Sequence, residues 1–363
     1  MQLVSRLTPD PGIRPTAMPF VNRDGVGQPR RQRMDLSIII VNWKSTDFLL
    51  ACLENIKTDV TSARAQIIVV DNASAEDEIL RIQNSHADIT LIKSERNLGF
   101  SRANNLGFRH AIGEYILFLN PDTEPIGTAI DVLLRKIKTL PDAGIVGCRL
   151  LNSDRTVQLS SIQKFPTVLS QVLDAERLLR LWPGCPLWRL DPLFAPISPP
   201  VQVDAISGAC MMVRREVFAA VGMLSEDYFM YSEDLDLNYK VRRAGFKNYY
   251  VGEAEVIHHG GKSSSRQGSA HWGVIMKCEA TLTYFCNTRG RLYGLQYRGA
   301  MVCAALVRLF LLGMWYPCDA ITRDGNGTLQ ALKKWGAVLS WAAGMAGAPI
   351  RTEPRSARPR QQT

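Results

Sequence analysis

The sequence lacks cysteine pairs at metal-binding spacing and has little histidine. Its 363 residues include eight scattered cysteines and five histidines, so we expect neither a zinc site nor a disulfide framework. No charged start followed by an apolar segment and a cleavage site precedes Met34, and no internal repeat is visible. We therefore expect a chain without a signal peptide, located in the cytoplasm.

The composition is that of a soluble globular protein, with 46% hydrophobic and 21% charged residues. The net charge of +9 is concentrated at the two ends, which we interpret as a disordered basic arm at 1–34 and a basic tail at 351–363. Such tails are solvated segments or bind anionic surfaces. Because aromatic residues are not interleaved with the basic ones, nucleic acid is not an expected partner.

Continuous apolar runs predict strands that are buried on both faces, at 36–41, 67–70 and 115–119. Helical patterns at 48–59 and 104–111 alternate with them. This alternation predicts an α/β fold with a mostly parallel, Rossmann-like sheet flanked by helices.

Ligands of parallel sheets bind beyond the carboxyl ends of the strands. Polar residues follow all three predicted strands there: Asn42, Asp71-Asn72 and Asn120-Pro121-Asp122. We expect them to converge on one crevice.

The second half predicts further elements: helices at 126–140, 215–221 and 234–244, and strands at 145–146, 209–213 and 247–251. A Pro-rich stretch at 165–200 is either an acceptor-side loop or a packed surface excursion. After residue 265 the stretch 280–297 is aromatic and basic, and helical patterns follow at 300–316 and 328–345. The apolar segment 300–316 carries Arg308 at its centre, which favours a core-packed or in-plane helix over a membrane span.

Two acidic sites suggest a metal and a base. Glu233, Asp234 and Asp236 crowd the start of a helix, where like charges raise the pKa of at least one carboxyl, as a general base requires. Acids that favour the helix dipole are the alternative. Asp122 could hold a divalent cation and His258 could complete its shell, although a simple turn and a structural histidine explain the same residues.

Two further segments suit a nucleotide. Asp71 could accept a hydrogen bond from a pyrimidine imide, or it could form an Asx turn. The segment 95–107, with Asn97, Gly99 and Asn104, combines a glycine turn, a basic side chain and a helix start, which suits a diphosphate. A Gly-capped connector is the alternative.

Five motifs occur in order: Val-Asp-Asn-Ala-Ser, Arg-Asn-Leu-Gly-Phe-Ser-x-Ala-Asn-Asn, Leu-Asn-Pro-Asp-Thr, Phe-Met-Tyr-x-Glu-Asp-x-Asp-Leu and His-x-Gly-Gly-x-Ser-Ser. The chain thereby resembles a family 2 glycosyltransferase of the GT-A fold over residues 36–298. Within that family it is most similar to rhamnosyltransferases that act on lipid-linked precursors of bacterial surface polysaccharides.

The resemblance implies a role for each site residue. Asp234 would be the catalytic base, with Glu233 and Asp236 orienting the acceptor and the helix. Divalent magnesium or manganese would be held by Asp122 and His258. The resemblance and the strand ends together give the substrate-binding set: Asn42, Asp71, Asn72, Asn97, Gly99, Asn104, Gly208 and Asp236.

The resemblance also implies an inverting transfer of one sugar, L-rhamnose from dTDP-rhamnose, to a lipid-linked saccharide at the inner face of the plasma membrane. The transferase domain would span 35–265, with a nucleotide-binding half at 35–122 and an acceptor half at 123–265, and a helical, membrane-associated extension at 266–350. Asn120 replaces the first acid of the family's Asp-x-Asp motif, and Lys240 replaces a usual arginine. The absence of a Gln-x-x-Arg-Trp motif argues against processive synthesis.

Three alternatives remain open. A UDP- or GDP-sugar donor would use the same motifs. A nucleotidyltransferase would need a Gly-rich triphosphate loop, which residues 42–45 do not supply. A non-catalytic nucleotide or sugar binder would have no need of Asp122, Asp234 and His258 together.

Overall fold

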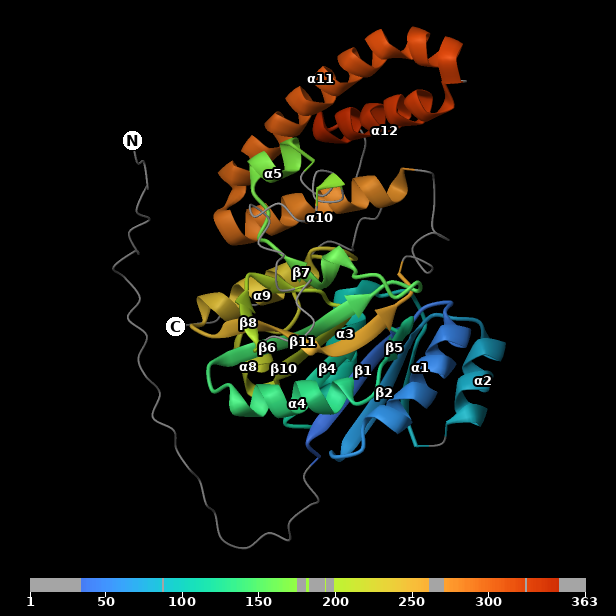
Figure 1. Ribbon diagram of the computed structural model, residues 1–363, viewed down its shortest axis with the longest axis vertical. Helices are drawn as coiled ribbons and strands as arrows, with labels where there is room; N and C mark the ends of the chain where they lie inside the picture. The colour runs from blue at the N-terminus through green and yellow to red at the C-terminus, as the bar shows by residue number, and fades with distance from the viewer. Residues whose placement is uncertain are drawn as a thin grey trace, which may run out of the picture. The chain divides into compact units, whose positions relative to one another are not determined.

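The computed structural model describes residues 34–86, 88–174, 181–182, 193, 199–260, 271–323 and 325–345, all within one compact unit (Figure 1). The basic arm expected before Met34, most of the Pro-rich stretch, the Gly-x-Ser-Ser part of the last motif and the basic tail lie outside the described residues.

Strands and helices alternate through the first half and helices dominate the end of the chain (Figure 1). The strands are β1 (Leu36–Asn42), β2 (Ala65–Asn72), β3 (Thr90–Ser94), β4 (Tyr115–Leu119), β5 (Thr123–Pro125), β6 (Ala143–Leu151), β7 (Ile162–Gln163), β8 (Val201–Val203), β9 (Ala205–Ile206), β10 (Cys210–Arg214) and β11 (Lys247–His258). The helices are α1 (Thr46–Asp59), α2 (Glu76–Ser85), α3 (Gly99–His110), α4 (Ala129–Thr139), the 3₁₀ turn η1 (Leu159–Ser161), α5 (Val168–Val172), α8 (Arg215–Ala220), α9 (Glu233–Arg243), α10 (Trp272–Arg289), α11 (Arg291–Arg323) and α12 (Asn326–Ala342).

Helices cover both faces of the main sheet, which explains the unbroken apolar runs. Ile38 and Ile40 of β1 join a core with α1 and α4 on one face. Ile39, between them, joins a second core with α3, α8 and α9 on the other face. Successive side chains of a strand point to opposite faces, so a strand covered on both sides has apolar residues on both faces.

The main sheet of the described residues runs β3-β2-β1-β4-β10-β6-β11-β5, with β8 also paired to β11. Strands β3, β2, β1 and β4 are parallel, as are β6 and β11. The predicted α/β class with a helical C-terminal region is confirmed. Strand β10 is antiparallel to both of its neighbours, β4 and β6.

Several boundaries differ from the sequence prediction. Helix α3 begins at Gly99 rather than Asn104. The aromatic and basic stretch 280–297 includes the end of α10 and the start of α11, which are separated at Gly290, where φ is +89°. Helix α11 then continues through Pro317, well past the predicted end at 316.

The three C-terminal helices enclose a third core, with Tyr284, Phe285 and Trp341 at its centre. Tyr228 is buried in the same cluster, and Tyr239 of α9 packs against it. The Tyr239 hydroxyl donates to the Thr288 carbonyl oxygen (3.3 Å). The helical extension is therefore packed directly against the helix that carries the acidic motif.

Candidate active site

The carboxyl ends of β1 and β2 hold a buried polar pair. Asn42 and Asp71 are in register, and Asn42 Nδ2 donates to Asp71 Oδ1 (3.1 Å). The Ser74 backbone N–H donates to Asp71 Oδ2 (3.0 Å), so the Asp71 side chain closes a turn with the backbone three residues on. Each carboxylate oxygen can accept two hydrogen bonds, so this turn leaves capacity for a ligand donor.

The end of β2 also fixes the glycine turn. Asn72 Nδ2 donates to Asn97 Oδ1 (2.9 Å), and the Leu98 N–H donates to Asn72 Oδ1 (2.7 Å). Gly99 has a φ of +77°, and a Cβ atom there would lie 2.5 Å from the Phe229 carbonyl oxygen. Only glycine fits this backbone crossing, which ties the turn to the segment before the acidic helix.

Two predicted substrate-binding side chains are engaged within their own helices. Asn104 is buried and donates to the Phe100 carbonyl oxygen (3.0 Å) inside α3. Asp236 is buried and pairs with Lys240 Nζ (3.1 Å). Lys240 also donates to the Met223 carbonyl oxygen (2.6 Å). The lysine that replaces an arginine thus has internal partners, and the substrate roles of Asn104 and Asp236 stay predictions.

The predicted metal ligands are adjacent. Antiparallel pairing of β5 with β11 puts Thr123 opposite His258, and this brings His258 Nε2 within 3.4 Å of Asp122 Oδ1. His259 is engaged elsewhere, with its Nε2 2.7 Å from Glu124 Oε1. Among the residues that the structure describes, no group of three His, Cys, Asp or Glu side chains could hold a metal.

The state of His258 suits a cation. Its Nδ1 lies 2.8 Å from Gln158 Oε1, an acceptor, so Nδ1 carries a proton. The Nε2 atom then faces Asp122 Oδ1, and also Asn120 Nδ2 at 3.3 Å. A cation beside Nε2 would make the contact with the carboxylate favourable. Magnesium-type ions accept one or two protein ligands when substrate phosphates supply the others, so Asp122 and His258 fit such an ion.

Asp234 is the best-held carboxylate of the acidic motif. Its Oδ2 accepts from Gln163 Nε2 (2.9 Å) and from the Gly208 N–H (3.1 Å), and its Oδ1 accepts from the Leu235 N–H (2.8 Å). Burial nevertheless raises the pKa of Asp234. A carboxylate with fixed orientation and a raised pKa has the properties of a general base.

Glu233 differs from its neighbour. Its Oε2 is buried without a hydrogen-bond partner, and burial, with a smaller effect from the Asp234 charge, raises the pKa of Glu233 to about 8. From the sequence, crowded like charges are the expected cause of a raised carboxyl pKa. In the structure, burial is the larger cause for Glu233, Asp234 and Asp236 alike.

The backbone before the acidic helix is strained. Tyr231 and Ser232 have φ values of +70° and +63°, in a region that non-glycine residues rarely adopt. Ser232 is the residue before α9, and its side chain makes no capping hydrogen bond. Strain of this kind persists where the surrounding structure requires it, and it clusters at functional sites.

The two acidic sites flank one short segment. The Gly208 N–H binds Asp234, and the next carbonyl, that of Ala209, accepts from the Asn120 N–H (2.9 Å). A Cβ atom on Gly208 would lie 3.3 Å from Asp234 Cβ and 3.8 Å from Phe100 Cε1. The structure therefore gathers the predicted base Asp234, Gly208 and the turn at Asn120–Asp122 into one region.

Sequence reasoning missed the residues that orient this site. Gln163 binds Asp234 and Gln158 binds His258, and neither belongs to a motif quoted above. Both contacts join residues about 70 to 100 positions apart, so no local pattern marks them.

The sequence profile described as "Glycosyl transferase family 2" matches residues 37–222, about half of the chain. The chain belongs to this family. A solved structure with a similar fold is that of the mannosyltransferase PcManGT from Pyrobaculum calidifontis, which contains GDP-Man and Mn²⁺. The TM-score is 0.51 at 16% identity, covering 86% of this chain and 87% of that one. The likeness supports the predicted GT-A type of fold.

Three curated relatives are similar in sequence. N-acetylglucosaminyl-diphospho-decaprenol L-rhamnosyltransferase of Mycobacterium tuberculosis is 31% identical over 51% of this chain and 63% of its own length. Low-salt glycan biosynthesis hexosyltransferase Agl10 of Haloferax volcanii is 32% identical over 66% of this chain and 71% of its own. Rhamnosyltransferase WbbL of Escherichia coli is 30% identical over 61% of this chain and 82% of its own length. The chain thus spans just under two thirds of the mycobacterial relative, and the expected rhamnosyltransferase-like branch is confirmed.

Proposed function

We propose that this chain is an inverting, metal-dependent glycosyltransferase that moves one sugar, L-rhamnose from dTDP-rhamnose, to a lipid-linked saccharide in bacterial surface polysaccharide or cell-wall synthesis. The observation that carries the proposal is the Asp234 carboxylate, fixed by Gln163 and Gly208 beside the Asn120–Asp122 turn. The names of the mycobacterial and E. coli relatives support rhamnose as the sugar.

Asp234 acts in this mechanism by accepting the proton of the acceptor hydroxyl as that oxygen attacks the anomeric carbon. The bond to the nucleoside diphosphate breaks from the opposite side, so the configuration inverts. Gln163 and the Gly208 N–H hold the carboxylate in one orientation during the transfer. Glu233, with its pKa of about 8, stays neutral near pH 7 and adds no second charge beside the base.

The donor is held at the strand ends. Asp71, oriented by Asn42 and the Ser74 N–H, accepts from the imide N–H of the pyrimidine, and the turn at Asn97–Gly99 lies against the diphosphate. Asp122 and His258 would hold a magnesium or manganese ion. That ion, when bound, stabilises the charge on the departing diphosphate.

The division of the chain follows from this assignment. Residues 35–122 serve the nucleotide, residues 123–265 serve the acceptor, and the extension at 266–350 meets the membrane that carries the lipid-linked acceptor. The site of action is then the cytoplasmic face of the plasma membrane.

The first test is a thermal-shift panel with thymidine, uridine and guanosine diphosphates, each with and without magnesium or manganese. A ligand that binds only the folded state raises the melting temperature. We expect the largest metal-dependent rise with the thymidine nucleotide. A larger rise with the uridine or guanosine nucleotide would assign another donor, and no rise with any of them would leave a non-catalytic scaffold.

Asp234→Asn tests the base. We expect an unchanged nucleotide shift and a loss of transfer of about 10²- to 10⁴-fold, since the shape is kept and the proton acceptor is removed. Asp47→Asn is the matched control, because Asp47 is an exposed carboxylate on α1 that pairs with Arg81. Transfer at the unaltered rate in Asp234→Asn would remove Asp234 from the mechanism.

A further inference from the structure

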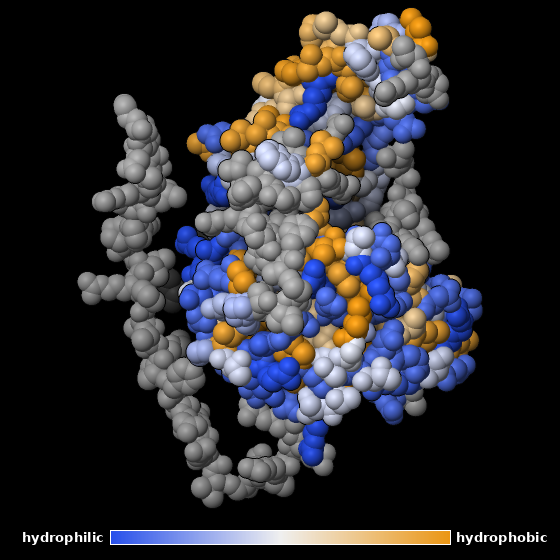
Figure 2. All heavy atoms as spheres, in the orientation of Figure 1, coloured by the Kyte–Doolittle hydropathy of each residue, from blue (hydrophilic) through white to orange (hydrophobic). Residues whose placement is uncertain are grey.

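Helix α11 presents a long apolar face to the surroundings. Within Arg291–Ile321 the mean hydropathy reaches 1.7, and only 17% of the most apolar window is buried in the protein. The exposed large side chains recur at helical spacing on this face: Leu306, Val307, Phe310, Leu311, Met314, Trp315 and Ile321. Figure 2 shows the orange surface that they form over α11. At 1.5 Å per residue, the stretch 303–321 runs about 27 Å.

Charged side chains are absent from this face. Between residues 299 and 321 the sequence holds two charged residues, Arg308 and Asp319, and both turn toward the protein. Asp319 is buried and accepts from Thr328 Oγ1 (2.6 Å) on α12. Arg308 Nη2 donates to the Val172 carbonyl oxygen of α5 (2.7 Å). An apolar patch of this extent on a protein surface marks an interaction site.

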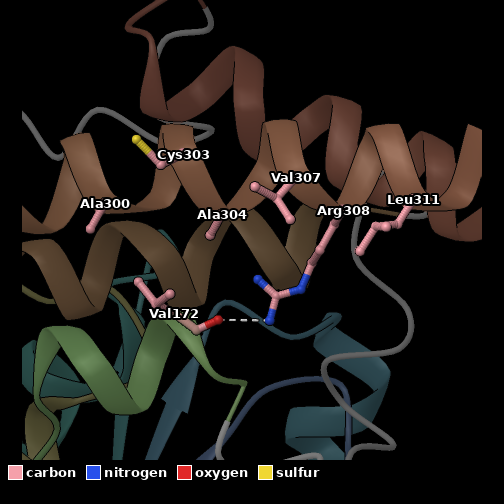
Figure 3. A pocket seen from close by; sticks show the side chains of 7 residues that line it. All are labelled: Val172, Ala300, Cys303, Ala304, Val307, Arg308 and Leu311. Atoms are coloured by element: carbon pink, nitrogen blue, oxygen red, sulfur yellow. Dashed lines mark hydrogen bonds between the residues drawn. The ribbon is translucent and has the colours of Figure 1, made fainter.

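A groove of about 490 Å³ lies along the same face, between α5 and α11 (Figure 3). Its lining is apolar apart from Arg308: Val172, Ala300, Cys303, Ala304, Val307, Arg308 and Leu311. The guanidinium of Arg308 stacks 4.2 Å from the Trp335 ring centre, and Lys334 Nζ lies 5.3 Å from the same ring. Two cations therefore flank one tryptophan beside an aliphatic groove.

The groove is connected to the candidate active site by a short segment. Gln163 binds the Asp234 carboxylate, and Val172, nine residues later, forms the wall of the groove. Between them, the Val168 N–H donates to the Tyr293 hydroxyl (3.3 Å) at the start of α11. The same segment thus contacts both the proposed base and the apolar helix.

We propose that the exposed face of α11 docks in a lipid bilayer, with the helix lying in the membrane plane. The lack of outward-facing charge between residues 303 and 321 selects lipid as the occupant, because an apolar face and groove with Lys334 nearby fit a hydrocarbon chain with an anionic phosphate head group. The in-plane orientation follows from packing, since α12, α10 and α5 all pack against α11 and leave only part of its surface for lipid. Trp315 on the apolar face is typical of a helix at the membrane interface.

This placement of α11 adds to the proposed function. Only the delivery of the acceptor, described next, rests on that function. A lipid-linked saccharide would keep its hydrocarbon chain in the bilayer beside α5 and α11. Its sugar would then reach Asp234 along the segment between Gln163 and Val172. The enzyme would not have to extract the acceptor from the membrane.

Native cysteines make the test direct. Cys303 and Cys318 are exposed on α11, while Cys52, Cys148, Cys210 and Cys278 are buried. In the full chain with Cys185 and Cys286 changed to serine, Cys303→Ser or Cys318→Ser leaves one exposed thiol for a polarity-sensitive fluorophore. With vesicles of phosphatidylcholine and phosphatidylglycerol, we expect both labels to shift their emission to the blue.

A variant that places charges on the apolar face provides a second test of membrane docking. Phe310→Asp combined with Met314→Asp should lower co-sedimentation with these vesicles at least tenfold, because it places two charges on the lipid-facing surface. Leu80→Asp with Ile112→Asp is the matched control, since both residues are exposed but lie outside α11; we expect no change in vesicle binding.

Two outcomes would overturn the proposal. Emission that does not respond to vesicles would show that the face stays outside lipid. A blue shift that instead grows with protein concentration in the absence of vesicles would show that a second copy covers the face. Neither readout needs a donor, an acceptor or turnover, so a failure of the proposed transfer reaction leaves this test intact. Vesicle binding with no transfer would reject only the proposed function.

Discussion

At the scale of residues, Glu233 and Asp234 show how neighbouring carboxyls acquire different properties. Asp234 accepts three N–H hydrogen bonds, which favour its charged form. Glu233 is buried, and its Oε2 has no hydrogen-bond partner. When two interacting carboxyls share one proton, these contacts assign the proton to Glu233 and the negative charge to Asp234.

The free energy of unfolding should therefore depend on the Glu233 proton. The pKa of Glu233 is about 8 in the folded chain, against 4.5 for an ordinary glutamate. Between these values the folded state binds more protons than the unfolded state, so stability falls as pH rises from 4.5 to 8 and levels off above 8. Denaturant unfolding at several pH values would measure this slope. Glu233→Gln should flatten it, and an unchanged slope in that variant would assign the proton elsewhere.

The sequence could predict those residues of the site that belong to short sequence motifs. Asp122 and His258 lie together as expected. The orienting contacts of Gln158 and Gln163 could not be predicted, because they depend on strand pairing between distant segments. Burial of Glu233 was also invisible in the sequence, since it depends on packing around the start of α9.

At the scale of elements, the entry to α9 stores backbone strain. Ser232 has a left-handed backbone but no capping hydrogen bond to lose. Ser232→Gly should therefore raise the free energy of unfolding by about 0.5–1 kcal/mol, the relief of the Cβ clash less the added flexibility of glycine. Ser232→Ala keeps the Cβ atom and should give no gain. Chemical denaturation compares the two variants, and equal effects would mean that the Cβ atom is not strained.

Elements with a strong apolar run were predicted well, as β1, β2 and β4 show. Strand β3 and helix α2 were not predicted. Strand β3 (Thr90–Ser94) contains a lysine and, among the strands that the structure describes, pairs only with β2. An edge strand of this kind lacks the continuous apolar run of a central strand. Helix α11 is longer than predicted because Pro317 lies inside it, whereas a proline usually ends a helix.

At the scale of the whole molecule, the C-terminal helices and the catalytic part share one core. Trp341 on α12 is buried, its ring lies 6.0 Å from that of Tyr297, and its Nε1 donates to Glu279 Oε2 (2.7 Å). The same cluster includes Tyr228 and packs against Leu235 of α9. Loss of packing in the extension should therefore be transmitted to the acidic helix.

Trp341→Ala should lower the free energy of unfolding by about 3–5 kcal/mol. Amide hydrogen exchange should show reduced protection in α9 as well as in α10–α12. Trp315→Ala is the matched control, because Trp315 is exposed and its removal should change stability by about 0.5 kcal/mol or less. Reduced protection confined to the C-terminal helices would mean that the two parts open independently.

The overall topology could be predicted only in part. Alternating strands and helices indicated the parallel portion, and the family resemblance indicated the GT-A type of fold. The insertion of β10 between β4 and β6 could not be read from periodicity, because an apolar strand has the same pattern in either direction.

That insertion has a consequence for synthesis on the ribosome. Strand β4 pairs with β10, and Leu119 lies opposite Cys210. Cys210 follows Leu119 by roughly 90 residues, and at about 5–20 residues per second the ribosome needs of the order of 5–20 s to translate them. During this interval, β4 can pair with β1 while its other edge presents unbonded N–H and C=O groups. A nascent chain released before residue 210 would keep that edge permanently open, and such truncated products should self-associate.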